Sequence, residues 1–243
     1  MIKGLFRSAS GMLPAIKKQE TVANNIANAN TAGFKKDGVF TRELSRAQRQ
    51  SIPTQSEWQQ PMVDHLWTDY TGGSFDRTDN PLDLAIDGDG FFQVELGDGR
   101  TALTRSGTFS INRDGLLAHA DGPVLLADGG AVEPGNGTIT ISATGEIDVD
   151  GNVVGRITPV TVDNLQELEK VGSSLFIVPE GVETVPVPQS VIRQGYLEES
   201  NVDIVKQMID MIVAYRTYES NARAVSSQDS SLEHLFRRVG DSG

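Results

Sequence analysis

Apolar residues recur every three or four positions along the C-terminal segment, in alternating steps of four and three from Ile204. A repeat of about 3.5 residues is typical of a helix that packs along a coiled-coil seam. Ser200 and Asn201 offer an N-cap and Asp203 lies in the first turn, so we expect a helix that runs to about Arg238. Only Asp229 interrupts the stripe, which consists of Ile204, Met208, Met211, Tyr215, Tyr218, Ala222, Val225, Asp229, Leu232 and Phe236.

A second stripe with the same repeat begins at the N-terminus. It predicts a helix from about Ile2 to Asn28, which ends where asparagines and Gly33 tolerate a left-handed backbone. Pro14 deletes a backbone hydrogen bond inside it, so we expect either a kink near Ser10 to Pro14 or a helix that starts there. The stripe consists of Ile2, Leu5, Ala9, Met12, Ile16, Gln19, Ala23 and Ile26.

Each stripe needs a partner. The two terminal helices are natural partners for one another or for neighbouring chains. Ile209, Ile212 and Val213 widen the apolar face of the C-terminal helix beyond what one partner would cover. The pattern therefore favours a subunit that assembles with other chains over an enzyme.

The middle of the chain has a different pattern. Residues 34–80 show no sustained period, and we expect an extended connector that packs through aromatic residues such as Trp58 and Trp67. From Leu82 onward, Asp-Gly and Asn-Gly pairs separate short apolar runs, which is typical of consecutive antiparallel strands.

The predicted fold class is α+β. Long N- and C-terminal helices pair in a coiled-coil-like layer, and a connector leads to a central all-β antiparallel domain. The expected boundaries are 1–33 for the N-terminal helix, 34–80 for the connector, 81–197 for the β domain and 198–243 for the C-terminal helix.

Charge narrows the function further. The formal net charge of −12 argues against a nucleic-acid partner, because duplex binding depends on Lys and Arg. Residues 1–50 carry a net charge of +6 and residues 51–243 carry −18, an asymmetry that could steer like subunits together or simply reflect a solvated helix. The chain has no cysteine. We expect no secretory signal and no membrane span, so only another export system would place the protein outside the cytoplasm.

No catalytic, cofactor or metal site is predicted. His65, His119 and His234 lack metal-ligand spacing and are expected on the surface or in loops. Residues 97–102 match a G-x-G-x-x-A string, but they join two predicted strands, so we expect a hairpin. Asp148, Asp150 and Asn152 begin like a calcium loop, which fails at the positions where glycine and glutamate are needed.

An asparagine cluster stands out instead, because asparagine is a mediocre helix former. Asn24, Asn25, Asn28 and Asn30 could fix the register between packed helices, or they could form a solvated helix end. Arg216, Glu219 and Arg223 can form exposed pairs along the C-terminal helix.

Three blocks resemble the bacterial flagellar basal-body rod and hook proteins. They are Val22 to Lys35 (VANNIANANTAGFK), Asn80 to Phe92 (NPLDLAIDGDGFF) followed by Thr104-Arg105-Ser106-Gly107, and Gln194 to Asp203 (QGYLEESNVD) continued by Met208, Met211-Ile212, Arg216, Tyr218-Glu219 and Asn221. The resemblance implies a structural axial subunit of the rod that assembles with itself and other axial proteins. It further implies export by the flagellar type III apparatus and a place in the periplasmic part of the rod.

Residues 155–160 and 171–176 look more like the proximal than the distal rod protein. The alternatives are a distal rod subunit, a secreted β-domain binding module on a coiled-coil stalk, and an enzyme acting on carbohydrate with paired carboxylates. The expected assembly interface consists of Leu5, Met12, Ile16, Ala23, Asn24, Asn25, Ile26, Asn28, Asn30, Ile204, Met208, Met211, Ile212, Tyr215, Tyr218, Glu219, Ala222 and Val225.

Overall fold

The computed structural model describes residues 2–45, 59–120, 122–128, 130–135 and 137–240. The chain divides into two compact units. Unit 1 comprises residues 1–27, 37–68 and 203–243, and unit 2 comprises residues 28–36 and 69–202. The chain therefore passes between the units four times.

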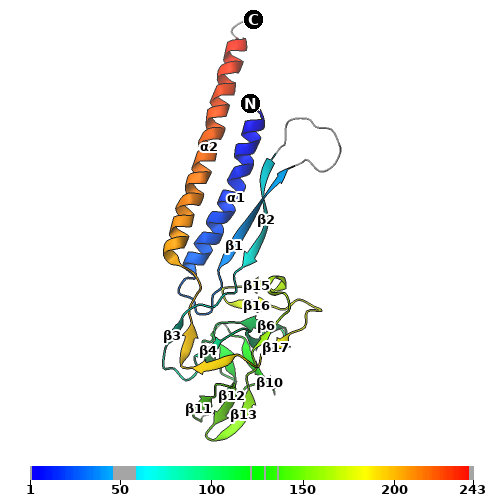
Figure 1. Cartoon of the computed structure of the whole chain (residues 1–243), viewed down its shortest axis with the longest axis vertical. Helices are drawn as coiled ribbons and strands as arrows, with labels where there is room; N and C mark the ends of the chain where they lie inside the picture. Colours follow the sequence, from blue (N-terminus) through cyan, green and yellow to red (C-terminus); the bar gives the residue numbers. More distant parts are fainter. Residues whose placement is uncertain (1, 46–58, 121, 129, 136, 241–243) are drawn as a thin grey trace. The chain divides into compact units, whose positions relative to one another are not determined.

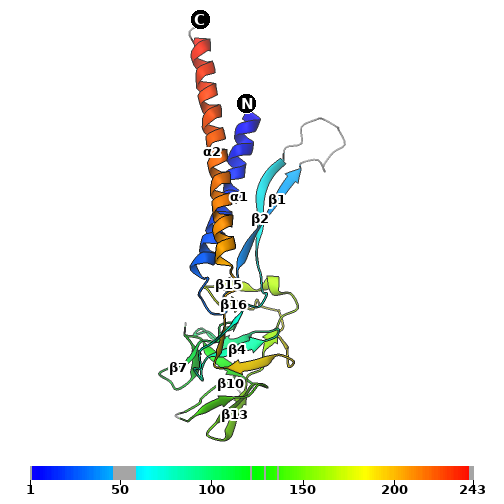
Figure 2. The ribbon, with the colours of Figure 1, turned by 60° about the vertical axis from the view of Figure 1, so that its left-hand side comes forward.

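Unit 1 is built from two long helices and a hairpin. The helices are α1 (Ile2–Ala27) and α2 (Ile204–Gly240), and the strands are β1 (Asp37–Ser45) and β2 (Gln59–Thr68). The helices lie side by side, and the hairpin lies beside α1 (Figures 1 and 2). The two ends of the sequence thus fold together in one unit.

Helix α1 continues through Pro14, so the expectation of a helix that begins at that residue is wrong. The helix ends at Ala27, and a turn follows in which the Thr31 N–H donates to the Asn28 carbonyl. Gly33 then adopts a φ of 67°, a left-handed conformation that glycine accepts without strain.

The start of α2 differs from the predicted cap. Asp203 Oδ1 accepts a hydrogen bond from the Lys206 N–H at 3.0 Å, so Asp203 is the N-cap. Asn201 is engaged inside unit 2, where its Oδ1 accepts from the Lys36 N–H at 2.8 Å and its amide donates to the Asp69 carbonyl. The prediction of a cap at Ser200-Asn201 is therefore wrong.

The segment expected to be a connector carries the β1–β2 hairpin. The two strands pair from Asp37 with Thr68 to Ser45 with Gln59, with an irregularity after Phe40. A Cβ at Gly38 would lie only 2.5 Å from the indole ring of Trp67. Glycine at this position lets the Trp67 ring lie directly on the opposite strand.

Unit 2 is an antiparallel β domain. Its main sheet has the order β15-β16-β6-β5-β9-β8-β7, with β10 pairing β9. These strands are β5 (Phe92–Glu95), β6 (Thr101–Thr104), β7 (Phe109–Ile111), β8 (Leu117–His119), β9 (Val124–Ala127), β10 (Gly130–Ala131), β15 (Glu169–Val171) and β16 (Leu175–Ile177).

Smaller sheets and one short helix complete unit 2. The sheets have the orders β11-β12-β13, β14-β17, β18-β4 and β19-β3. The elements are β3 (Phe75–Arg77), β4 (Leu84–Asp87), β11 (Ile139–Ile141), β12 (Glu146–Val149), β13 (Asn152–Arg156), β14 (Val160–Thr161), the 3-10 helix η1 (Leu165–Glu167), β17 (Val185–Pro186), β18 (Val191–Gln194) and β19 (Tyr196–Glu198).

Local turn chemistry explains much of this domain. Asp150 and Gly151, between β12 and β13, both adopt positive φ, at 52° and 88°, as a two-residue hairpin turn of type I′ requires. Some of the short strands bury one face, such as β5, and others bury both, such as β4. Leu84, Phe92 and Ile147 are among the fully buried residues of the larger core cluster.

His119 is a correction to the expected surface position of the histidines. It lies in β8, is buried, and its ring packs edge to face against Phe109 with centroids 6.0 Å apart. The side chains of His65 and His234 lie outside the described residues.

Candidate assembly interface

The contact between α1 and α2 includes polar pairs. Asn25 hydrogen-bonds Gln207 at 3.1 Å, and Lys18 forms an ion pair with Asp210 at 3.0 Å. A Cβ at Gly11 would lie 2.9 Å from Nδ2 of Asn221, so α2 approaches α1 closely there. Positions 11, 18 and 25 are seven residues apart, and the pairing order makes the helices antiparallel. We call these residues the polar seam: Gly11, Lys18 and Asn25 with Gln207, Asp210 and Asn221.

Asn25 is the buried residue of the asparagine cluster, with 1% of its surface exposed. Its amide donates to the Asp37 carbonyl at 2.8 Å as well as to Gln207, and its Oδ1 accepts from the Asp37 N–H at 2.9 Å. One side chain therefore holds the end of α1, the start of β1 and the first turn of α2 in register.

The other asparagines of the cluster occupy different surroundings. Asn24 and Asn30 are exposed. Asn28 is half-buried, and its Oδ1 accepts from the Thr31 hydroxyl at 3.3 Å. Asn24 and Asn25 are the two members of unit 1, whereas Asn28 and Asn30 belong to the turn in unit 2.

The faces that pack inside unit 1 are displaced by one position from the predicted stripes. On α1, Ala15 and Val22 are buried, whereas Ile16 and Ala23 are exposed. On α2, Gln207 and Ala214 are buried at 8% and 3%, whereas Met208 and Tyr215 are exposed. The remaining predicted positions Met12, Ile26, Met211, Tyr218, Glu219, Ala222 and Val225 are half-buried, and the Leu5 side chain lies outside the described residues.

A continuous apolar surface is left on α2, which we call the α2 stripe. Its members Val205, Ile209 and Ile212 are 68%, 58% and 54% exposed. Helix α1 contributes exposed Leu13 and Ile16. Monomeric soluble proteins rarely expose large contiguous apolar patches, so such a surface indicates contact with another molecule. The α2 stripe consists of Ile204, Val205, Met208, Ile209, Ile212, Val213 and Tyr215.

Unit 2 contains a buried charge cluster centred on Glu198. Lys35 Nζ lies 2.5 Å from Glu198 Oε1, and Arg105 Nη1 lies 3.2 Å from Oε2. The three side chains are at most 7% exposed. We call Lys35, Arg105 and Glu198 the Glu198 cluster.

Backbone groups supply further hydrogen bonds to this cluster, although Arg105 Nε is buried without a partner among the described residues. Lys35 donates to the Thr71 carbonyl at 2.7 Å, and Glu198 Oε1 accepts from the Gly73 N–H at 3.0 Å. Arg105 donates to the Gly88 carbonyl at 2.8 Å. The three residues come from three separate sequence blocks and meet only in the folded unit, so no local pattern identifies them.

The protonation of Lys35 depends on this environment. Burial lowers the pKa of Lys35 below its ordinary value of 10.5, and the attraction of Glu198 only partly opposes this effect. The Arg105 guanidinium, which carries a like charge, also acts to lower this pKa. The cluster is thus held together by one carboxylate between two cations.

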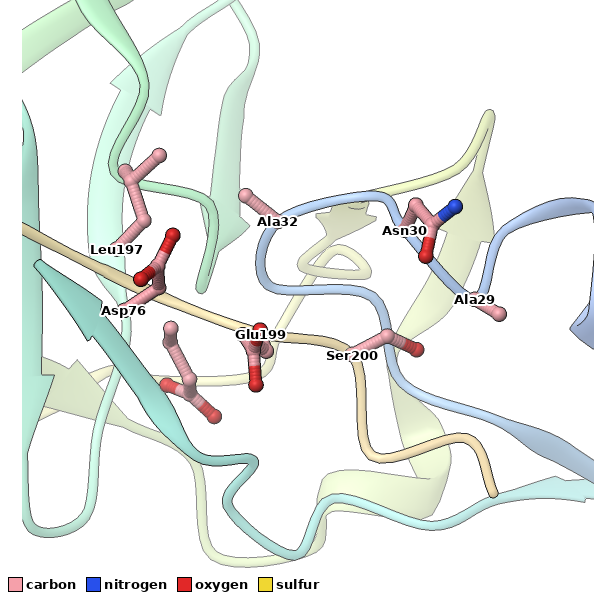
Figure 3. Close-up of a pocket in the computed structure, with 8 residues that line it drawn as sticks. Ala29, Asn30, Ala32, Asp76, Leu197, Glu199 and Ser200 are labelled. Carbon is pink, nitrogen blue, oxygen red and sulfur yellow. The ribbon is translucent and has the colours of Figure 1, made fainter. Parts of the chain in front are cut away.

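A small cavity of about 170 Å³ lies beside this cluster (Figure 3). Ala29, Asn30 and Ala32 from the turn after α1 line one part of it, and Asp76 and Glu199 supply carboxylates. Pockets for small-molecule ligands have volumes of roughly 300–1,000 Å³, so this one suits a few waters or a single side chain.

The described residues contain no group of three or more His, Cys, Asp or Glu side chains that could hold a metal ion. The G-x-G-x-x-A string forms the turn between β5 and β6, and Asp148, Asp150 and Asn152 belong to the β12–β13 hairpin. Among the described helices, none is long and apolar enough to cross a membrane.

Comparison with known proteins identifies three family domains in the chain. Residues 8–35 match the flagella basal body rod protein family, and residues 85–149 match the D1 domain of the flagellar hook protein FlgE/F/G family. Residues 193–237 match the C-terminal domain of the flagellar basal body rod FlgEFG proteins. The first and last of these contain the residues of the polar seam.

Similar proteins align over almost the whole chain. The flagellar basal-body rod protein FlgF of Caulobacter vibrioides is 32% identical over 243 residues, covering 99% of both chains. The FlgG proteins of Bacillus subtilis and Caulobacter vibrioides are 32% and 34% identical, with at least 96% of each chain covered. The chain therefore belongs to the flagellar basal-body rod protein family, as a structural, non-enzymatic subunit of the flagellar basal body.

Proposed function

We propose that this protein is an axial subunit of the proximal rod, in which copies of the chain and other axial proteins cover the α2 stripe. The observation that carries the proposal is the position of the apolar residues. The polar seam occupies the contact within unit 1, and the α2 stripe faces away from it.

The energetics favour burial of the α2 stripe on assembly. Fully burying one large aliphatic side chain is worth about 1.5–3 kcal/mol as an upper bound, and the stripe offers several in a row. Polar contacts such as Asn25–Gln207 specify register but contribute less. The helices would then pair as a coiled coil whose stability depends on neighbouring subunits.

The predicted interface residues fall into two groups under this proposal. Exposed Ile16, Ala23, Asn24 and Asn30 would contact neighbours directly, together with the exposed α2 residues. Half-buried residues such as Met211 and Tyr218 would contact both the other helix of their own chain and a neighbouring subunit.

The proposal includes the route and the place. The subunit would leave the cytoplasm through the flagellar type III apparatus without a cleaved signal peptide, and would occupy the periplasmic part of the rod. A distal rod subunit is the alternative. Electron microscopy of basal bodies from a strain lacking the protein separates the two, because arrest before any rod forms indicates a proximal subunit.

A single exposed residue tests the role of the α2 stripe. Ile209→Asp places a charge in the middle of the stripe, and Ser220→Asp places the same charge at an exposed polar position of the same helix. We expect Ile209→Asp to abolish motility and leave basal bodies without the subunit, with Ser220→Asp close to wild type. Normal basal bodies containing the Ile209→Asp chain would refute the proposal.

A further inference from the structure

The last segment of unit 2, residues 191–201, completes the β domain. Strand β18 is the sheet partner of β4, and β19 is the sheet partner of β3. Ile192 is buried in the larger core cluster. Gln194 bonds the edge of β11 through its side chain, accepting from the Ile141 N–H at 3.1 Å and donating to the Ile139 carbonyl at 3.0 Å.

The N-terminal segment of unit 2, residues 28–36, forms hydrogen bonds and an ion pair with residues 191–201. The Gly33 N–H donates to the Glu198 carbonyl at 2.7 Å, and Lys35 pairs with the Glu198 carboxylate. The Lys36 N–H donates to Asn201, and Asn201 donates to the Asp69 and Thr71 carbonyls. Residues 28–36 and 191–201 therefore close unit 2 together, although more than 150 positions separate them in the sequence.

The buried charges make this closure depend on the presence of both Lys35 and Glu198. Without Glu198, the buried positions of Lys35 and Arg105 hold two cations with no counter-charge, and an unpaired buried charge is strongly destabilising. Without Lys35, the carboxylate loses one of its two cationic partners and the Thr71 carbonyl loses the ammonium donor. A partly formed domain that lacks Glu198 thus carries two unpaired cations, and one that lacks residues 33–35 loses the hydrogen bonds of Gly33 to Glu198 and of Lys35 to Thr71.

We propose that the Glu198 cluster is a folding gate, which prevents unit 2 from reaching its packed state until residues 33–35 and 198 are both available. Unit 2 therefore remains unpacked while the chain passes through a channel, whichever terminus enters the channel first. The gate is a property of unit 2 and holds whether or not the proposed rod position is right.

Pulse-labelling hydrogen exchange during refolding of the full chain tests the gate. In the wild-type protein we expect amides of β4 and β6 to become protected in the same kinetic phase as those of β18 and β19. In Glu198→Gln we expect protection of β4 and β6 to slow by about tenfold or more, because the substitution raises the barrier to closure.

A control lies on two of the strands whose protection is followed. Arg193 of β18 pairs with Asp87 of β4 on the surface, so Asp87→Asn removes an exposed carboxylate charge between β18 and β4. We expect its folding rate to stay within about twofold of wild type, since exposed ion pairs contribute little. Lys35→Met should slow folding less than Glu198→Gln, because it removes one cation and keeps the Glu198–Arg105 pair.

Two results would overturn the gate. One is a wild-type phase in which β4 and β6 are protected before β18 and β19. The other is an unchanged folding rate in Glu198→Gln, with the loss of stability confined to faster unfolding. If Glu198→Gln fails to fold, the order of protection in the wild type and the rate of Lys35→Met decide the question.

Discussion

Two glycines with left-handed backbone differ in what surrounds them. Gly33 (φ 67°) lies against the backbone of Arg105 and Ser106, which a Cβ would overlap. Gly99 (φ 81°) has open space on that side. Backbone conformation alone makes the two equivalent, and packing separates them.

Alanine substitutions measure this difference. We expect Gly33→Ala to destabilise unit 2 by about 2 kcal/mol more than Gly99→Ala. The positive φ strains alanine at both positions, but only the Cβ at position 33 also overlaps neighbouring atoms. Urea denaturation of the full chain, followed through hydrogen exchange of β4 and β6 amides, gives both values. Equal destabilisation would contradict the close packing of the turn after α1 on the Arg105 segment.

Asp69 makes the stability of unit 2 depend on acidity. Partial burial acts to raise its pKa, but hydrogen bonds from Thr71 and the pair with Lys36 outweigh burial, so the pKa of Asp69 lies below its ordinary value of 3.8. The folded state thus binds this proton less readily than the unfolded chain, and the stabilisation present above pH 3.8 is lost as the pH falls through the lower folded-state pKa.

Replacing the Asp69 carboxylate tests the direction of this pH dependence. We expect Asp69→Asn to reduce the decrease in the unfolding free energy of unit 2 between about pH 4 and pH 2. Urea titrations at a series of pH values measure the slope. An identical slope in wild type and Asp69→Asn would show that the ionised Asp69 has no special stabilisation in the folded unit.

At the scale of elements, the sequence predicts the two helices and the turns of the β domain, because glycines and heptads act locally. It leaves open which faces pack within the chain and which face other chains. The strongest apolar stripe on α2 is exposed, while Gln207 and Asp210 contact α1. The seven-residue spacing of Gly11, Lys18 and Asn25 on α1 is a signal that hydrophobic periodicity does not register.

Long-range features escape the sequence for a different reason. In the β1–β2 hairpin, apolar and polar residues do not alternate as they do in a half-buried strand. Leu66 and Trp67 are adjacent apolar residues, and both are exposed. The Glu198 cluster joins residues 163 positions apart, and nothing near Lys35 or Glu198 marks them as partners. Pairings of this kind depend on the folded topology.

Asn25 is where three elements of unit 1 meet. We expect Asn25→Ala to destabilise unit 1 by about 1–3 kcal/mol, because the Asp37 N–H and the Gln207 side chain lose a buried partner. Asn24→Ala, at the exposed neighbouring position, should cost less. Hydrogen exchange at the base of the hairpin measures both, and equal effects would contradict the register role of Asn25.

At the scale of the whole molecule, the net negative charge is concentrated in one unit. Unit 2 carries 22 Asp and Glu against nine Lys and Arg, a net charge of −13, whereas unit 1 is nearly neutral at +1. The α2 stripe belongs to unit 1. Like net charge disfavours close approach of the β domains, which agrees with the proposal that association comes from the helices.

Sedimentation separates an axial subunit from a self-contained stalk. Under the proposal, we expect the purified protein to sediment mainly as a monomer of 26.2 kDa. We expect its helical ends to be sensitive to protease, because a single chain leaves the α2 stripe in water. A discrete dimer or trimer that persists on dilution would favour the stalk instead.

The most direct measurement of burial on assembly is chemical labelling. Because the chain has no cysteine, Ile209→Cys introduces a single thiol in the α2 stripe, and Glu180→Cys introduces one at an exposed position of unit 2. We predict that maleimide labels both in the isolated chain, and that in purified basal bodies only the thiol at position 209 is protected. Equal labelling of position 209 in the isolated chain and in basal bodies would contradict the account.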